Sequence, residues 1–580
     1  MDGFTLASSE SGFFQQPPAL TNHFLGDNIL ISILQRILPK DVYGAIRPDL
    51  EKMGQRVITD VKEMGDNAED PANYPRLRQY DAWCRRVDEL ITSEGWRKLH
   101  DVSAEEGLVA IAYERKYGQY SRIYQMAKQY LFMSASATYA CPLSMTDGAA
   151  RCLEVKGSKE LKEKYFQKLT SRDPSEFYTS GQWMTERPGG SDVSNTETIA
   201  ECIDEKQNLW SITGFKWFSS ATDANITMLL ARTKDPKTGK LTKGSKGLSL
   251  FLAEVHRPDG SLNGVRIHRL KQKFGTKGLP TAELELKGMV GHMIGEQGRG
   301  VATISSLLNI TRIYSGLSCV TAMRGSLAIA KEFAKIRTAF GRTIRDHPLH
   351  LTTLSNLDVT FRAACNFAFY AIELLGAVEC NAASHEQEQM LRLITPIFKL
   401  WAGKIAVPFV SEAMEALGGQ GYMEESGLPR ALRDVQVNAI WEGTTNILSL
   451  DVLRVAFKTK GEALQIFDKI IDQKLENAAA ELKDSKEKVR EAKRIIGEYV
   501  ANNTLALERT AREVALSLAR ILAATLLIEH ASWMKVHNPQ EWQADRLAAE
   551  RFIQRGLVGD LSGLSSENED YLLVYGQTKL

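Results

Sequence analysis

The residue of this chain that is best suited to acid–base chemistry is a single carboxylate, Glu442. Ile440 and Trp441 precede it, and Gly443 and Thr444 follow it. A carboxylate held among apolar neighbours loses hydration, so its pKa rises and it can remove a proton near neutral pH. The small and hydroxylated residues after it leave room for a ligand and supply hydrogen bonds. An acid in an ordinary loop or at a helix start has the same local pattern. Whether Glu442 is a catalytic residue therefore has to be decided from the rest of the chain.

Other segments carry groups that suit a polar or anionic ligand. The glycine-containing run 182–193 offers hydroxyls and free backbone N–H groups. Trp217 lies in an expected strand, where a Trp by itself is more often a core residue. Arg337 opens the run Arg-Thr-Ala-Phe-Gly, and the planar fork of a guanidinium matches phosphate oxygens. Gly418 and Gly419 would let phosphates approach the backbone.

These groups must be positioned by elements of two kinds. Apolar residues at three- and four-residue spacing predict helices, and short β-rich runs between turn signals predict strands. We expect a mainly α protein with an inserted, mostly antiparallel β-domain. The predicted segments are an N-terminal arm (1–25), a helical domain (26–180), a β-barrel domain (181–298), a helical bundle (299–456) and a C-terminal helical extension (457–580).

Composition narrows the class of protein. The chain has 580 residues, and its 72 Lys and Arg nearly balance its 71 Asp and Glu, so no net field favours nucleic acid or an anionic membrane. Seven scattered cysteines argue against a disulfide framework and for a reducing compartment. The ten histidines show no metal spacing, and no metal is expected. No βαβ unit accompanies the glycine clusters, so a Rossmann site is not expected. No apolar run reaches the roughly 20 residues of a membrane span.

Taken in order, the segments 182–193, 214–220, 309–342 and 412–444 resemble the acyl-CoA dehydrogenase family. The likeness covers about residues 130–456 well and the flanks more loosely. It implies a helical N-domain, a small β-barrel and a helical bundle, with FAD as cofactor. In tetrameric relatives the cofactor contacts cross a subunit interface, so the resemblance also implies a homo-oligomer, expected to be a tetramer.

The resemblance assigns roles to residues at matching positions. Glu442 becomes the catalytic base, while Arg312 and Ser191 contact the substrate. Isovaleryl-type relatives have their catalytic Glu at the position of Thr311. Because this chain has Thr there, that position offers no alternative catalytic base. The implied cofactor residues are Met184, Thr185, Gly190, Ser191, Trp217, Ser219, Arg337, Phe340, Gly418, Gly419, Thr444 and Asn446. Many relatives have Gln at the position of Glu415, so Glu415 is not counted among the cofactor residues.

Further motifs are similar to the AidB branch of the family. They are Cys141-Pro-Leu-Ser-Met-Thr146, Gly190–Thr196 and Gly421–Arg430, together with the long extension. In the bacterial relative a basic C-terminal surface is associated with DNA binding. Here residues 457–580 are balanced in charge, so nucleic-acid binding is not expected.

The expected function is therefore FAD-dependent α,β-dehydrogenation of a fatty acyl thioester. The alternative is an AidB-like protective or regulatory flavoprotein that binds a fatty acyl ligand or DNA with little turnover. A nitroalkane-oxidase-like enzyme typically has Asp at the base position, and Glu442 speaks against it. The sequence leaves acyl chain length, CoA binding and the electron acceptor open.

The two ends of the chain bear on where the protein is targeted in the cell. The terminal Thr578-Lys579-Leu580 approximates the Ser-Lys-Leu peroxisomal signal. The first 23 residues contain no Lys or Arg, which disfavours a mitochondrial presequence. We expect a peroxisomal or cytoplasmic protein that is not secreted.

Overall fold

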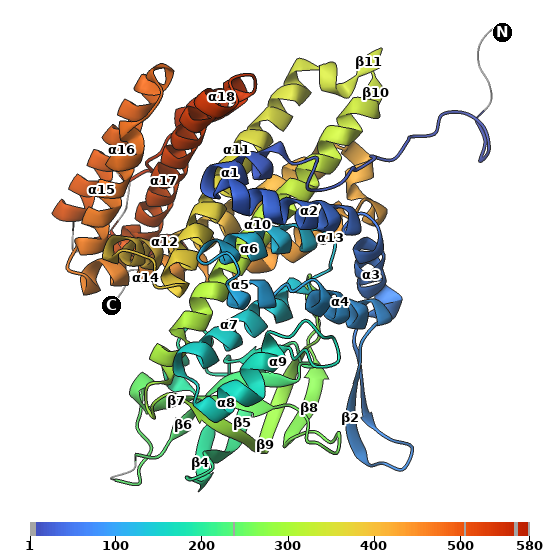
Figure 1. Ribbon diagram of the computed structural model, residues 1–580, viewed down its shortest axis with the longest axis vertical. Helices are drawn as coiled ribbons and strands as arrows, with labels where there is room; N and C mark the ends of the chain where they lie inside the picture. Colours follow the sequence, from blue (N-terminus) through green and yellow to red (C-terminus); the bar gives the residue numbers. More distant parts are fainter. Residues whose placement is uncertain (1–6, 236–237, 504–505, 562–565, 578–580) are drawn as a thin grey trace.

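The computed structural model describes residues 7–235, 238–503, 506–561 and 566–577 (Figure 1). The predicted terminal address at 578–580 lies outside the described residues. Residues 7–25 form no helix or strand, as expected of an arm, and lead into the first helix at Asn28. The predicted fold class, a mainly helical protein with an inserted β-domain, is confirmed.

The first third of the chain is helical, with one exception that the sequence analysis missed. β1 and β2 form an antiparallel hairpin within the segment predicted as helical. Its charged residues, such as Arg78 and Glu89, alternate with partly buried ones in a short period-2 pattern that a helical prediction overlooks. The elements are α1 (Asn28–Ile37), α2 (Lys40–Arg56), α3 (Asp60–Glu69), β1 (Arg76–Tyr80), β2 (Arg86–Ile91), α4 (Glu94–Glu105), α5 (Ala110–Glu114), α6 (Tyr120–Phe132), α7 (Ala140–Lys156), α8 (Lys159–Leu161) and α9 (Gln167–Leu169).

The inserted β-domain is a seven-stranded sheet whose pairing closes on itself. β6 pairs with β4 and β7, β7 with β9, β9 with β5, and β5 with β4, while β3 and β8 are added at the outside. Every residue of β6 is buried, as expected for a strand covered on both faces. The strands are β3 (Ser180–Trp183), β4 (Ile199–Asp204), β5 (Leu209–Ser220), β6 (Ile226–Thr233), β7 (Leu248–Glu254), β8 (Val265–Leu270) and β9 (Thr281–Ile294).

Long helices then form the bundle above the barrel (Figure 1). A capping box of Ser384 and Gln387 starts α12, and Pro348 occupies the first turn of α11, where its missing N–H costs nothing. The turn Gly295–Gly300 follows a strand, β9, but among the described residues no parallel strand comes after α10, so this turn is not part of a Rossmann unit. The elements are α10 (Gly300–Ile336), β10 (Thr338–Ala339), β11 (Arg342–Thr343), α11 (Pro348–Glu379), α12 (His385–Glu415), α13 (Leu428–Gln436) and α14 (Thr445–Lys458).

The C-terminal extension packs on this bundle through α17, whose central residues 521–528 are buried. By length and composition alone, α11, α12 and α17 among the described helices are apolar enough to cross a membrane, but most of each apolar stretch is buried inside the protein. The remaining elements are α15 (Glu462–Glu476), α16 (Lys483–Asn502), α17 (Leu507–His537), α18 (Trp542–Gln554) and α19 (Glu567–Tyr575).

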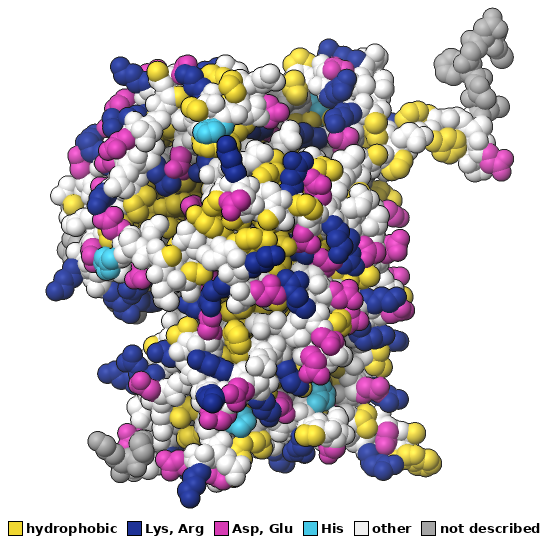
Figure 2. All heavy atoms as spheres, viewed as in Figure 1, with side chains coloured by type: hydrophobic (Ala, Val, Ile, Leu, Met, Phe, Trp, Pro, Cys, Tyr) yellow, Lys and Arg dark blue, Asp and Glu magenta, His cyan; other side chains and the backbone are white. Residues whose placement is uncertain are grey.

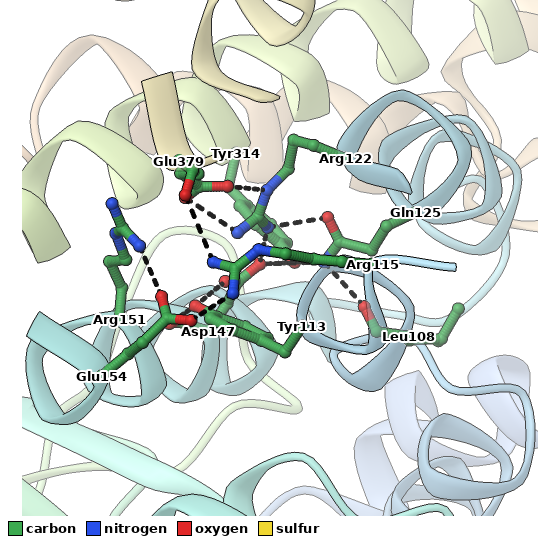
Figure 3. A network of polar contacts seen from close by, with 10 residues as sticks. All are labelled: Leu108, Tyr113, Arg115, Arg122, Gln125, Asp147, Arg151, Glu154, Tyr314 and Glu379. Carbon is green, nitrogen blue, oxygen red and sulfur yellow. Dashed lines mark hydrogen bonds and ion pairs between the residues drawn. The ribbon is translucent and has the colours of Figure 1, made fainter. Parts of the chain in front are cut away.

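A buried ionic network locks α7 to α6, α10 and α11 (Figure 3). Arg122 of α6 donates to Asp147 of α7 at 2.6 Å and to both oxygens of Glu379 of α11 at 2.7 and 2.9 Å. Tyr314 of α10 and Gln125 donate to the same Asp147 oxygen at 2.9 and 2.8 Å. Burial raises the pKa of Glu379, and the Arg122 charge opposes that rise. Each buried charge is therefore compensated only while all the helices keep their relative positions.

Replacing Arg122 by Met should destabilise the protein by about 3–5 kcal/mol, because two buried carboxyl groups lose their common partner. Urea denaturation followed by Trp fluorescence measures the change. The control is Arg494→Met, which removes solvent-exposed ion pairs on α16 and should leave the denaturation midpoint unchanged. Equal midpoints for the two variants would show that the network does not hold the helices.

Candidate active site

Glu442 lies in a short, left-handed turn between two helical segments. The turn follows the 3₁₀ turn Val437–Ala439 and precedes α14. Glu442 has φ of 57° and Gly443 has φ of 106°. A left-handed conformation at a non-glycine residue is strained, and such residues gather at functional sites. A Cβ on Gly443 would also approach Leu448 to 2.9 Å, so glycine is needed directly after the acid.

Three side chains hold this turn in place. Thr311 donates its hydroxyl to a carboxylate oxygen of Glu442 at 2.7 Å. Arg312 donates to the Glu442 carbonyl at 3.3 Å and pairs with Asp451 of α14 at 2.9 Å. Lys399 of α12 donates to the Gly443 carbonyl at 2.5 Å. The side chain of the turn is therefore fixed from α10, and its backbone is fixed from both α10 and α12.

The electrostatics of the turn suit a base. Burial raises the pKa of Glu442, while the Thr311 hydrogen bond and the charges of Arg312 and Lys399 oppose the rise. This is the direction that the sequence predicted. The Glu442 residue as a whole keeps partial exposure, while its carboxyl group is desolvated. Burial also lowers the pKa of Lys399 to about 8, so its cation is held in a costly position beside the acid.

Sequence reasoning missed Lys399 and Asp451. Lys399 is a buried cation in a strongly apolar stretch of α12, between Phe398 and Leu400. A lone Lys in such a stretch signals a buried partner, because an unpaired buried charge is costly. The partner, a main-chain carbonyl 44 positions later, has no sequence signature. Asp451 is one of many acids on helix surfaces, and no pattern distinguishes it.

A second group of predicted residues lies on the β-domain. The N–H of Trp217 donates to the carbonyl of Thr185 at 2.9 Å, so β5 and the loop after β3 lie side by side. Met184 is partly buried against the barrel, whereas Gly190 and Ser191 are exposed. The loop thus presents hydroxyl groups and backbone next to the Trp217 ring.

A buried ion pair fixes this loop. Glu186 accepts from Lys216 at 2.7 Å and from the hydroxyl of Thr198 at 2.5 Å, with both charged groups buried. Coulombic attraction and the hydrogen bonds hold the pKa of Glu186 below its usual range against its burial. We expected a polar loop here and did not foresee this pair.

The hydroxyl of Ser219 indicates that the predicted residues on the β-domain fit a cofactor. Ser219 is fully buried, and its Oγ has no hydrogen-bond partner among the described residues. A buried hydroxyl without a partner is costly, and a bound ligand can supply one. Trp217, two positions earlier on β5, is partly exposed, with Lys271 3.3 Å from the centroid of its ring. A flat heteroaromatic ring with polar edges, such as flavin, fits these groups.

Cys141 links the two groups. It packs with Met145 of α7 and with Ala221, which follows β5 directly. Burial, with a smaller contribution from the Glu442 charge, raises the pKa of Cys141 to about 12. The thiol is therefore neutral, and the end of β5 lies in the neighbourhood of the candidate base.

The remaining cofactor candidates fall into two places. Thr444 uses its hydroxyl as the N-cap of α14, and Asn446 is exposed and accepts from Arg512 of the extension at 3.4 Å. Arg337, Phe340, Gly418 and Gly419 lie at the far end of α10, where Leu417 packs with Phe333. At about 1.5 Å of rise per residue, α10 carries Arg337 roughly 39 Å from Thr311. One chain does not bring this distal group to Glu442.

Comparisons with known proteins cover almost the whole described chain. Family profiles match residues 15–174 (adaptive response protein AidB N-terminal domain), 181–289 (acyl-CoA dehydrogenase, middle domain), 298–457 (acyl-CoA dehydrogenase, C-terminal domain) and 462–575 (acyl-CoA dehydrogenase 11 C-terminal domain-like). The order of the profiles is that of the helical, β, helical and extension segments.

Individual relatives give the same result. The chain is 44% identical to acyl-CoA dehydrogenase family member 11 of Caenorhabditis elegans, over 91% of this chain and 87% of that protein. It is 31% identical to the putative acyl-CoA dehydrogenase AidB of Escherichia coli, over 77% and 81% of the two chains. The crystal structure of C. elegans ACDH-11 in complex with C11-CoA superposes with a TM-score of 0.93 at 42% identity, covering 99% of this chain and 98% of that one.

Replacing Thr311 by Val should raise the pKa of Glu442 further, because the charged carboxylate loses a hydrogen bond that contributes about 1.5 kcal/mol. The pKa can be read from the difference in unfolding free energy between each protein and its Glu442→Gln counterpart. Since the folded pKa lies above the unfolded one, stability from this proton is full below pH of about 4 and is lost as the pH rises through the folded pKa.

The Thr311→Val substitution should move that loss to higher pH. Thr352→Val is the matched control, since this exposed Thr of α11 donates only to its own helix. Identical pH profiles for the two variants would exclude Thr311 as a determinant of the Glu442 pKa.

Proposed function

We propose that this chain, which belongs to the acyl-CoA dehydrogenase family, catalyses the FAD-dependent α,β-dehydrogenation of a fatty acyl thioester, with Glu442 as the base for the α-proton. The observation that carries the proposal is the desolvated carboxyl group of Glu442, whose turn is held by Thr311, Arg312 and Lys399. A proton acceptor needs both a raised pKa and a fixed position.

The main chain of the same turn supplies a second catalytic group. Among the described residues, the N–H of Glu442 donates to no backbone or side-chain acceptor. A free N–H beside the base can donate a hydrogen bond to the thioester oxygen and stabilise the negative charge that develops there, which makes the α-proton easier to remove. Arg312 holds the Glu442 carbonyl, which belongs to the following peptide group, so the backbone on the other side of the Glu442 α-carbon is fixed before the substrate binds.

The chain's own residues suit the cofactor of the family. Ser219 and Thr185 offer hydrogen bonds to the polar edge of a flavin ring, and Trp217 offers an aromatic face. FAD, when bound, supplies the two-electron acceptor for the hydride that leaves the β-carbon. The distal group, with Arg337 and Gly418, offers a cation and open backbone for a pyrophosphate.

The positions of these two groups support a homo-oligomer. The roughly 39 Å along α10 exceeds the reach of an extended flavin dinucleotide. The distal group of one copy therefore completes the cofactor site beside Glu442 of another. A tetramer, as implied by the family resemblance, provides such pairs of copies.

A fatty acyl thioester of medium length is the first substrate to test, since C11-CoA is the ligand of the similar nematode structure. The FAD-loaded protein should be titrated anaerobically with acyl-CoA of increasing chain length, and the flavin absorbance recorded. We expect bleaching with the preferred chain length. Stable acyl-CoA binding without bleaching at any length would contradict the dehydrogenase and support a ligand-binding regulatory protein instead.

Glu442→Gln should retain bound FAD and its yellow colour but lose flavin reduction by acyl-CoA, because an amide does not accept the α-proton. Stopped-flow absorbance measures the rate, and we expect it to fall by at least about a thousandfold. Glu498→Gln, on the exposed face of α16, is the control and should react as the unmodified protein does. Full reduction by the Glu442→Gln variant would sink the assignment of the base.

A further inference from the structure

The N-terminal arm, residues 7–25, carries aromatic side chains that the rest of the chain does not cover. Phe13 is 72% exposed and Phe14 is 57% exposed. The arm extends away from the helical body, and apolar side chains are visible along it (Figures 1 and 2). Hydration of adjacent apolar rings on an extended segment is unfavourable, and a partner that covers the rings removes this cost.

The arm touches one functional candidate, Arg337. The guanidinium carbon lies 5.3 Å from the centre of the Phe13 ring, and Nη1 donates to the Gln15 side-chain oxygen at 3.3 Å. No Asp or Glu of the described chain forms an ion pair with Arg337. A neutral amide and a ring face orient the guanidinium without cancelling its charge. The arrangement leaves a directed cation ready for an anion from outside this chain.

The surface around Arg337 is also uncovered. Phe340 is 97% exposed, Leu349 is 81% exposed and Tyr422 is 83% exposed. Nothing lies within 4 Å of the position that a Cβ on Gly418 or Gly419 would take. Exposed apolar residues from separate segments, a cation and an open glycine turn thus lie at the same end of α10. Apolar contact and anion binding are both needed where one copy covers a phosphate held by another.

We propose that the N-terminal arm is an interface element that packs on a second copy of this chain, where Phe13 and Gln15 hold Arg337 toward the pyrophosphate of the FAD beside Glu442 of that copy. This inference rests on the proposed FAD site. We choose a second copy as the partner because the distal group needs a pyrophosphate to bind. The FAD beside Glu442 of the same chain is too far away to supply it, so the FAD must be that of another copy. The arm thereby connects assembly to cofactor affinity.

The test compares the full-length holoprotein with its Phe13→Ser, Phe14→Ser double variant. Both rings are exposed, so folding should be retained, as shown by an unchanged far-ultraviolet spectrum and melting temperature. Native mass and the FAD dissociation constant are then measured at equal protein concentration. We expect a lower native mass and an FAD affinity weaker by about tenfold. Trp83→Ser, an exposed aromatic in the β1–β2 turn, is the control and should change neither quantity.

A second variant separates packing from the positioning of Arg337. Gln15→Ala leaves both rings in place but removes the hydrogen bond to the guanidinium, so FAD affinity should fall while the native mass is unchanged. Unchanged mass and FAD affinity in the double variant would overturn the proposal, as would a lower mass with full FAD affinity. Absence of FAD binding by the unmodified protein would instead show that the proposed function itself fails.

Discussion

The burial of one carboxyl group, that of Glu442, sets the requirements that the surrounding helices meet. A desolvated carboxylate must receive hydrogen bonds, and a left-handed turn must be held against its strain. α10 does both with consecutive residues, since Thr311 reaches the carboxylate and Arg312 reaches the carbonyl. α12 adds Lys399 from another direction. The base is therefore a product of helix packing rather than of its own loop.

The same helix packing depends on a second buried network. Tyr314 lies one turn beyond Thr311 on α10 and donates to Asp147 of α7, the carboxylate that Arg122 also binds. A displacement of α10 would remove the Tyr314 hydrogen bond from the buried Asp147 carboxylate, at a cost of about 1.5–3 kcal/mol. The position of Thr311 against Glu442 is consequently tied to the most deeply buried polar contacts of the bundle. The two networks make α10 a rigid support, which suits a site that must hold a base before the substrate arrives.

Much of the fold was predictable because it rests on local patterns. The helical segments on both sides of the β-domain follow from apolar residues at three- and four-residue spacing, and the β-domain follows from short β-rich runs between turn signals. The hairpin β1–β2 was not predictable in this way, because its strands are short and strongly charged.

In the candidate site, too, the features that are local in sequence were predictable and those that depend on tertiary packing were not. The Glu442 segment and the glycine-rich loop are continuous in sequence, and the direction of the Glu442 pKa followed from its apolar neighbours. Lys399 and the Glu186–Lys216 pair act across long separations in the chain. Their partners depend on tertiary packing, which no local pattern encodes. The roles of Arg337 and Gly418 depend further on a second copy of the chain.

The most direct test of Glu442 as the base is hydrogen exchange at the α-carbon. The FAD-loaded protein is incubated in D₂O with 3-thia-octanoyl-CoA, a thioester whose β-position holds sulfur and has no hydride to give. Mass spectrometry then follows deuterium at the α-carbon. The account predicts exchange by the unmodified protein and none above background by the Glu442→Gln variant. Equal exchange by the two proteins would contradict it.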